Sequence, residues 1–161
     1  FEENPIKTID EIVKAVKYLS LNKIGALIVI KKEDNLTDII QTGIPLNSIV
    51  TSELISTIFY TNSPLHDGAI VIDGNTIVAA RCLLPLSENE RLEKELGTRH
   101  RAGVGITEVT DAISIIVSEE TGIISLSTQG KLTRYLSVLE LRGMLILLLT
   151  KEKRGGKVKV D

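Results

Sequence analysis

The sequence predicts a single α/β domain in which a central mixed β-sheet is flanked by helices. Short, β-branched apolar runs such as Ile24 to Ile30 alternate with segments of helical periodicity such as Thr8 to Asn22. The chain has 161 residues, which is the size of one domain with a substantial core. No internal repeat or linker interrupts this alternation, so we expect one core over about 8–150 and a basic tail over 151–161.

The first half of the chain predicts a helix, a strand, an irregular segment and a second helix. Thr8 and Glu11 form a capping box, which marks the start of the first helix. Gly43 and Pro45 break the segment after the strand, so we expect no long element there. The predicted elements are, in order, a helix from Thr8 to Asn22, a strand from Ile24 to Ile30 buried on both faces, an irregular segment over 36–50, and a helix starting at Thr51 or Ser52.

The second half predicts two pairs of strands separated by helices. Asp73-Gly74-Asn75 lies between two apolar runs and is typical of a β-hairpin turn. Ser87 and Glu90 form another capping box, for a helix that Gly97 would end. The predicted elements are, in order, strands over 69–72 and 76–84, a helix over 87–97, a helix from Thr98, strands over 112–117 and 123–126, a helix capped by Ser137 and Glu140, and a frayed tail from Lys151 to Lys159.

Charge and composition exclude several classes of protein. A net charge of −2 argues against a protein that wraps nucleic acid. With two Phe, three Tyr and no Trp, the chain lacks the aromatic row on which single-stranded nucleic acids stack. The single Cys82 excludes an internal disulfide and a Cys-based zinc site, and its apolar neighbours indicate a packing residue of a strand. No stretch reaches the ~20 apolar residues that span a bilayer.

The first of three polar clusters stands just before the hairpin, in the sequence Leu65-His66-Asp67-Gly68-Ala69. His66 and Asp67 lie at the mouth of a predicted strand, and Gly68 lets a ligand come close to the backbone. A ligand site and a plain Asx turn both fit this segment. His66, like His100, is a candidate general base or ligand.

The second and third clusters also lie at the ends of predicted elements. In Gly97-Thr98-Arg99-His100-Arg101, two guanidinium groups, a hydroxyl and free N–H groups at a helix start suit a triphosphate, although a solvated basic helix face has the same pattern. Adjacent carboxylates in Ser118-Glu119-Glu120 suit Mg²⁺ or Mn²⁺, although a charged β-turn would look alike. The pair Gly103 and Gly105 is a lone G-x-G without a preceding strand, so we discount it as a nucleotide motif.

Taken together, the stretches LHDGA (65–69), GTRHRA (97–102) and SEETG (118–122) resemble the signature of the diadenylate cyclase domain family. The resemblance also covers IGALIVI (24–30), TGIPL (42–46) and the last capped helix, and therefore nearly the whole chain. It is nearest to the membrane-attached bacterial class, in which transmembrane helices precede the catalytic domain. We therefore expect that the chain, which begins at Phe1, is a fragment cut just after such helices.

The resemblance implies a nucleotidyltransferase with the diadenylate cyclase fold. Such an enzyme condenses two ATP molecules into cyclic di-AMP and releases two pyrophosphates. It implies a divalent metal (Mn²⁺ or Mg²⁺, with Co²⁺ as a further candidate), a homodimer that brings two ATP together, regulatory protein partners, no nucleic-acid partner, and a place at the cytoplasmic face of the bacterial cell membrane. A catalytically idle nucleotide sensor and a scaffold for a partner protein are the alternatives that the sequence leaves open.

The resemblance also implies roles for most residues of the three clusters and for Leu84. Arg101 has a second implied role, in supporting the fold of its loop. Leu83 stands where relatives of this class often have an aromatic residue on which adenine can stack, so we expect a difference in adenine affinity or in stacking geometry. The implied catalytic residues are Asp67 and Arg99; the metal ligands are His66, Asp67 and Glu120; and the nucleotide-binding residues are Gly68, Ala69, Leu84, Thr98, Arg99, His100, Arg101, Ser118 and Glu119.

Overall fold

The computed structural model describes residues 4–160, a range that contains five helices and seven strands. Phe1 and Asp161, at the predicted fragment start and tail end, lie outside this range. The helices are α1 (Pro5–Leu21), α2 (Thr37–Ile40), α3 (Ser52–Phe59), α4 (Thr98–Val109) and α5 (Val138–Val160). The strands are β1 (Ala26–Ile30), β2 (Ile44–Ile49), β3 (Ala69–Asp73), β4 (Thr76–Cys82), β5 (Ile113–Val117), β6 (Ile124–Thr128) and β7 (Lys131–Leu136).

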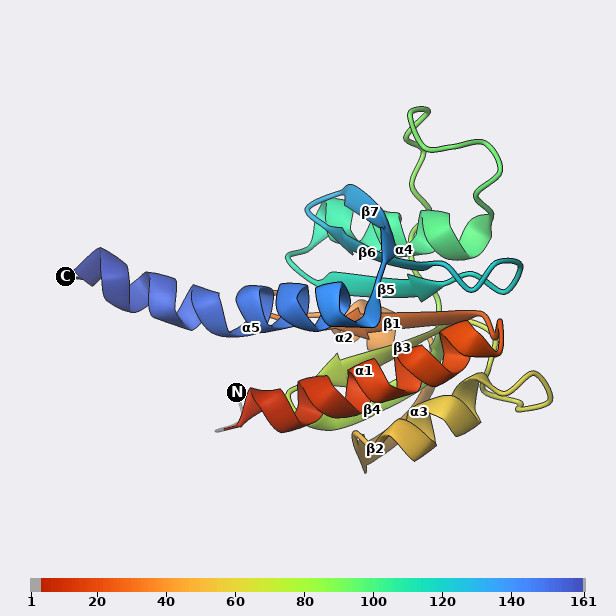
Figure 1. Ribbon diagram of the computed structural model, residues 1–161, viewed down its shortest axis with the longest axis horizontal. Helices are drawn as coiled ribbons and strands as arrows, with labels where there is room; N and C mark the ends of the chain where they lie inside the picture. The colour runs from red at the N-terminus through yellow and green to blue at the C-terminus, as the bar shows by residue number, and fades with distance from the viewer. Residues whose placement is uncertain (1–3, 161) are drawn as a thin grey trace.

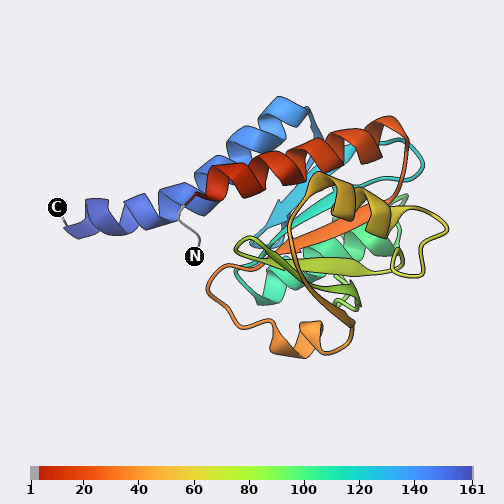
Figure 2. The same ribbon diagram turned by 90° about the horizontal axis from the view of Figure 1, so that it is seen from below.

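All seven strands form one mixed sheet in the order β2-β4-β3-β1-β5-β6-β7. β1 and β3 run parallel, and the other neighbouring pairs are antiparallel. Figures 1 and 2 show α1, α3 and α5 on one face of the sheet and α2 and α4 on the other. The predicted α/β fold with a mixed sheet between helices is therefore confirmed.

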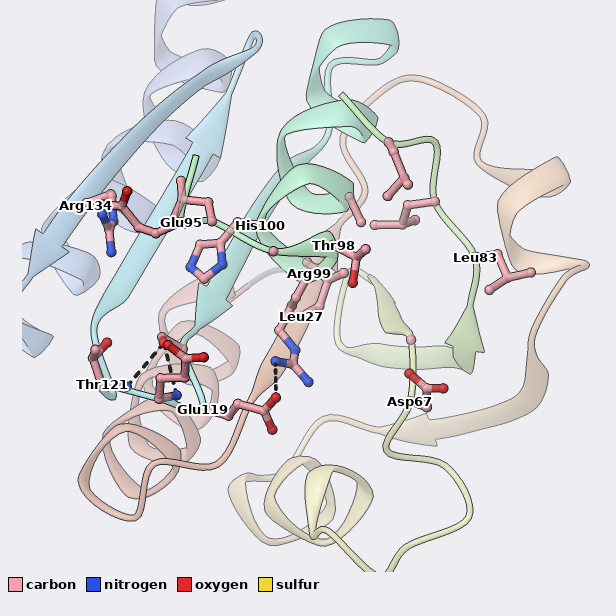
Figure 3. Close-up of a pocket in the computed structure, with 18 of the residues that line it drawn as sticks. Leu27, Asp67, Leu83, Glu95, Thr98, Arg99, His100, Glu119, Thr121 and Arg134 are labelled. Carbon is pink, nitrogen blue, oxygen red and sulfur yellow. Dashed lines mark hydrogen bonds and ion pairs between the residues drawn. The ribbon is translucent and has the colours of Figure 1, made fainter. Parts of the chain in front are cut away.

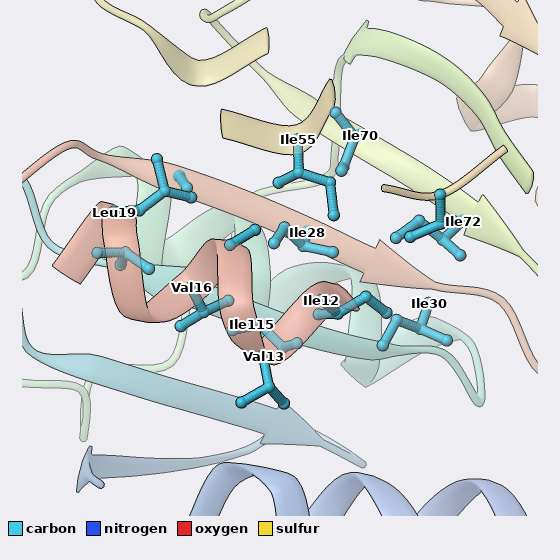
Figure 4. Close-up of a cluster of buried hydrophobic side chains, with 14 of the residues drawn as sticks. Ile12, Val13, Val16, Leu19, Ile28, Ile30, Ile55, Ile70, Ile72 and Ile115 are labelled. Carbon is cyan, nitrogen blue, oxygen red and sulfur yellow. The ribbon is translucent and has the colours of Figure 1, made fainter. Parts of the chain in front are cut away.

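The core has two layers because the central strand β1 is buried on both faces, as predicted. Ile28 and Ile30 face α1 in the larger cluster (Figure 4), whereas Leu27 and Val29 face α4 in the smaller one. α1 contributes residues spaced by three or four, which places them on one helix face. The buried members of that face are Ile9, Ile12, Val13, Val16 and Leu19.

Several local predictions are confirmed. The β3–β4 hairpin turns at Gly74, whose φ of 61° is easily adopted by glycine. Thr51 caps α3 by accepting a hydrogen bond from the Leu54 amide at 3.1 Å. Ser137 and Glu140 form the expected capping box at the start of α5, with bonds of 2.9 and 3.0 Å. Within residues 4–160 no helix is both long and apolar enough to cross a membrane.

The predicted helix over 87–97 is wrong, because this segment is an extended loop that projects beyond α4 (Figure 1). Ser87 is buried against α4 instead of capping a helix. Its amide donates to the Arg101 carbonyl at 2.9 Å, and its hydroxyl donates to Glu108 Oε2 at 2.8 Å. The capping pattern thus describes a loop fastened to a neighbouring helix.

Other differences concern element boundaries and the two edges of the sheet. α1 begins at Pro5, with Pro in the first turn where its missing N–H is harmless, rather than at Thr8. β2 and β7 were not predicted; β2 contains Pro45, which is tolerated because β2 is an edge strand. α5 continues to Val160, so the expected frayed tail from Lys151 to Lys159 is helical.

Candidate functional site

A cavity of about 530 Å³ opens at one end of the sheet, between the loop over 83–97, the start of α4 and the turn after β5 (Figure 3). It lies beside the first residues of β1 and β3 and the last residues of β4 and β5. All three predicted clusters, which are far apart in the sequence, contribute to it. The lining residues from these clusters are Asp67, Gly68, Gly97, Thr98, Arg99, His100, Ala102, Ser118, Glu119, Glu120 and Thr121.

The backbone around Asp67 is shaped by close contact between β3 and the end of β4. Gly68 has a φ of 111°, and a Cβ atom there would lie 2.9 Å from the Cys82 carbonyl oxygen. A bulge opposite, where Arg81 has a φ of 56°, bends the end of β4 toward Gly68. Glycine is therefore required at position 68, and it leaves the exposed Asp67 carboxylate at the cavity edge.

Cys82 lies at the end of β4 as the packing residue that the sequence predicts. It is buried, and burial raises the pKa of its thiol to about 11. The thiol is therefore protonated at neutral pH and is a poor nucleophile.

Arg99 projects from the first turn of α4 into the middle of the cavity. Its side chain is 27% exposed, and its Nη1 lies 3.8 Å from Glu119 Oε1 (Figure 3). The guanidinium group lies over Gly25, just before β1, where a Cβ atom would be 2.5 Å from the Arg99 Cζ atom. Gly25 therefore leaves room for the guanidinium, an arrangement that the sequence did not reveal.

The carboxylates of the third cluster are held by a tight turn. The buried Ser118 hydroxyl accepts hydrogen bonds from the amides of Glu120 and Thr121, at 3.2 and 3.3 Å. The Gly122 amide closes the turn by donating to the Ser118 carbonyl at 2.9 Å. Ser118 is thus a turn-forming residue as well as a cavity residue, and the exposed Glu119 and Glu120 follow it at the cavity wall.

His100 is buried beside the cavity, with only 7% of its surface exposed. Its Nε2 atom has no hydrogen-bond partner within the described part of the chain. Burial, and then the nearby charges of Arg134 and Arg99, lower the pKa of His100 to about 4. At neutral pH the ring of His100 is therefore uncharged. Its Nε2 atom can donate or accept one hydrogen bond, depending on the tautomer, but the ring adds no positive charge to the cavity.

The lowered pKa of His100 predicts a loss of stability in mild acid. Between the ordinary His pKa of 6.5 and about 4, the unfolded chain binds a proton that the folded chain does not. The contribution of the neutral His100 to the free energy of unfolding is therefore fully present above pH 6.5 and is lost as the pH falls. Between pH 7.5 and pH 5.0 the free energy of unfolding decreases by about 2 kcal/mol for this reason. Urea unfolding of wild type and His100→Gln at both pH values measures this decrease. The free energy of unfolding of the variant should fall by about 2 kcal/mol less than that of wild type, and an equal fall in both proteins would contradict the prediction.

Three of the predicted site residues lie away from the cavity. Ala69 is fully buried in β3, paired with Cys82. His66 directs Nδ1 to the Ser63 carbonyl oxygen at 2.7 Å, within its own loop. Arg101 lies between the cavity-lining His100 and Ala102 on α4 but does not line the cavity itself, and its backbone carbonyl accepts a hydrogen bond from the Ser87 amide in the loop. Ala69 and Arg101 do not line the cavity, so a nucleotide contact by either residue stays a prediction.

Other cavity residues were missed because they come from outside the three clusters. Arg134 from β7 and Glu95 from the loop lie at the end of the cavity opposite Asp67 (Figure 3). Leu83, noted for the missing aromatic ring, is 67% exposed at the other end. The remaining missed lining residues are the apolar Leu27, Leu86 and Leu96 and the buried Cys82.

The charges around the cavity bear on metal binding. The four acidic side chains Asp67, Glu95, Glu119 and Glu120 face two cations, Arg99 and Arg134, which leaves an excess of two negative charges. Among the described residues no group of three or more His, Cys, Asp or Glu side chains is placed to hold a metal by itself. The donor set instead fits a metal that is bound jointly by ligand phosphates and one or two carboxylates.

The fold and the cavity define an α/β domain with a polar pocket at one end of its sheet, where a helix start meets the ends of several strands. Residues 13–132 match the family described as DisA bacterial checkpoint controller nucleotide-binding, known as DAC. The chain belongs to this family, which confirms the resemblance found in the three motifs.

Known proteins with similar sequence and structure support this assignment. The chain is 54% identical to the cyclic di-AMP synthase CdaA of Bacillus subtilis over 144 residues, which are 89% of the chain and 53% of the relative. It matches the crystal structure of DacA from Staphylococcus aureus with a TM-score of 0.87 and 48% identity, over 90% of this chain and 97% of that one. A hypothetical membrane spanning protein from Bacillus cereus has a TM-score of 0.77 and 44% identity, over 80% and 63% of the two chains. The chain spans about half the length of the curated relatives CdaA of Bacillus subtilis and the diadenylate cyclase of Listeria monocytogenes.

Proposed function

We propose that this domain is a diadenylate cyclase, which condenses two ATP molecules into cyclic di-AMP and releases two pyrophosphates. The observation that carries the proposal is the meeting of three distant motifs in one cavity, with Asp67 at its edge and Arg99 at its centre. Relatives named cyclic di-AMP synthase and diadenylate cyclase support the choice of substrate.

In the proposed reaction each ribose 3′-oxygen attacks the α-phosphorus of the opposing ATP, and pyrophosphate leaves. Asp67 contacts the 3′-hydroxyl and accepts its proton. Thr98 and Arg99, at the start of α4, hold phosphate oxygens through the hydroxyl, the guanidinium fork and the helix N-terminus. Gly68 and Leu84 line the nucleoside end, where Leu83 gives adenine an apolar contact instead of an aromatic stack.

A divalent metal fits this proposal because the cavity itself carries an excess of negative charge. Asp67 and Glu120 are the side chains that would hold it, together with the phosphates. When bound, it would neutralise phosphate charge and favour ionisation of the 3′-hydroxyl. Mn²⁺, Mg²⁺ and Co²⁺ all accept such oxygen ligands.

The proposed active unit is a homodimer. A cavity of about 530 Å³ has the size of a site for one small-molecule ligand, whereas the reaction needs two ATP facing each other. A two-fold axis between two such cavities supplies that arrangement with identical surfaces. The similarity to a protein described as membrane spanning supports a place at the cytoplasmic face of a bacterial membrane, and regulatory protein partners would then reach the domain from the cytoplasm.

Incubation of the chain with ATP and Mn²⁺ or Mg²⁺, followed by identification of the product by mass, tests the proposal. Cyclic di-AMP and pyrophosphate are expected, and the reaction should stop when the metal is chelated. ATP binding without product would instead identify a nucleotide sensor. The absence of any ATP affinity would favour a scaffold for a partner protein.

Mixed dimers test whether Asp67 acts on the ATP that is bound to its own protomer. Suppose Asp67 activates the 3′-hydroxyl of the ATP on its own protomer. A dimer of one wild-type and one Asp67→Asn protomer should then form one phosphodiester bond and stall at the linear dinucleotide pppApA. Chromatography of mixtures at varied ratios should show this species peaking near equal amounts. Its absence at every ratio, or ring closure by an isolated monomer, would contradict the arrangement.

A further inference from the structure

We propose that Arg134 is a further substrate-binding residue, which holds the β and γ phosphates of ATP at the end of the cavity opposite Asp67. This inference rests on the proposed function for the identity of the ligand. Arg134 belongs to none of the three motifs and comes from β7, at the edge of the sheet.

The position of Arg134 in β7 is unusual for a charged residue. Along this strand the exposed Lys131, Thr133 and Tyr135 alternate with the half-buried Leu132, Arg134 and Leu136. Arg134 therefore shares the inward-facing positions with leucines, and only 14% of its side chain is exposed. Tyr135 has a φ of 62° at a bulge between β6 and β7, and bulges beside a site commonly redirect a neighbouring side chain.

The guanidinium group of Arg134 is only partly satisfied by the protein. Nη1 donates to Glu93 Oε2 at 2.6 Å, whereas Nε is buried and has no partner within the described residues. A buried N–H without a partner costs free energy, and a guanidinium has five donors suited to paired phosphate oxygens. The unpaired Nε–H of Arg134 and the unpaired Nε2 of His100 lie at the same end of the cavity (Figure 3).

The order of groups along the cavity matches the order of groups along ATP. Figure 3 shows Asp67 and Leu83 at one end, Thr98 and Arg99 in the middle, and Arg134 at the other end. If the ribose lies at Asp67 and the α-phosphate at Arg99, the β and γ phosphates extend toward Arg134. Arg134 would then hold the leaving pyrophosphate.

A different role for Arg134 must be separated from this one, because its ion pair with Glu93 also fastens the 83–97 loop to β7. That loop supplies several walls of the cavity. If Arg134 acts only as an anchor, its loss should affect every ligand of the cavity. Removal of Glu93, which is not a cavity-lining residue, should then have the same effect as removal of Arg134.

The test compares two ligands that share the adenosine and the α-phosphate. Calorimetry with Mg²⁺ would measure the affinity of wild type, Arg134→Gln and Glu93→Gln for α,β-methylene-ATP, whose α–β link cannot be cleaved, and for AMP. We expect Arg134→Gln to weaken the ATP analogue about 10-fold or more, and AMP by less than about twofold. Glu93→Gln should keep both affinities within about twofold of wild type.

Three results would overturn the inference: equal weakening of both ligands in Arg134→Gln, equal losses in Arg134→Gln and Glu93→Gln, or no weakening of the analogue. Because this readout is binding, it remains separate from the proposed reaction. A wild-type chain that binds the analogue but forms no cyclic di-AMP would refute the proposed function and leave the role of Arg134 testable. Thermal unfolding of Arg134→Gln would check that the variant is folded.

Discussion

Replacing Asp67 by Asn is expected to lower the rate of cyclic di-AMP formation by about 10²–10⁴ while ATP affinity stays near the wild-type value. Asn has the shape of Asp but no negative charge, so it can neither accept the proton of the 3′-hydroxyl nor help to hold a divalent metal. Asp67 is exposed at the cavity edge and forms no ion pair with another described residue. The change should therefore leave the fold intact.

A matched control lies on the same strand. Asp73, at the other end of β3, is exposed in the hairpin turn and does not line the cavity. Asp73→Asn should keep both turnover and ATP affinity. Initial rates of product formation and calorimetric titrations of the two variants would decide the matter. If Asp67→Asn turns over at close to the wild-type rate, Asp67 is only a turn residue. That result would favour the interpretation of its segment as a plain Asx turn.

The buried centre of the fold is predictable because its signals are local and strong. The continuous apolar run of β1, the turn at Gly74 and the capping box of α5 each determine their structure within a few residues. The three motifs predicted most of the cavity lining for a similar reason: each stands at the end of an element, and the sheet brings these ends together.

The edges of the sheet were missed because their signals depend on neighbours. β7 follows a two-residue turn, Gln129-Gly130, in which both residues have positive φ, and Gln is an uncommon residue in that conformation. Once β7 is recognised, its alternation places Arg134 at an inward position, and a charged residue there marks a candidate site residue. The sequence thus contained a signal for Arg134, but only after the strand had been identified.

The helix cap predicted at Ser87 was wrong for a different reason, because the hydrogen-bond partners of Ser87 are 14 and 21 residues away in the sequence. A Ser-x-x-Glu pattern reports only that a hydroxyl and a carboxylate are suitably spaced for a cap. Hydrogen bonds to Arg101 and Glu108 give Ser87 an alternative that requires the 83–97 loop to lie on α4. The Ser63 carbonyl contact of His66 Nδ1 was likewise not visible in the sequence, and the metal-ligand role of His66 stays a prediction.

The contact between that loop and α4 depends on a glycine and gives the second prediction of large effect. A Cβ atom at Gly105 would lie 1.9 Å from the Pro85 carbonyl oxygen and 2.9 Å from the Ser87 amide nitrogen. Both are backbone atoms, so no side chain can rotate away. The G-x-G that we discounted as a nucleotide motif thus has a packing role, and at Gly103 an added Cβ would meet the Ile116 side chain at 2.7 Å.

Gly105→Ala should therefore destabilise the domain by about 3 kcal/mol or more, because the loop must leave α4 or the helix must shift. Helix propensity alone predicts the opposite sign, since Ala is favoured over Gly in a helix by about 1 kcal/mol. Gly143 in α5 is the matched control: it is exposed and an added Cβ would meet nothing within 4 Å, so Gly143→Ala should be stabilising. Urea unfolding at neutral pH measures both changes, and a Gly105→Ala domain as stable as wild type would show that the loop does not rest on the helix. Since Leu84 and Leu86 flank Pro85 and line the cavity, the same variant should also lose ATP affinity, whereas Gly143→Ala should keep it.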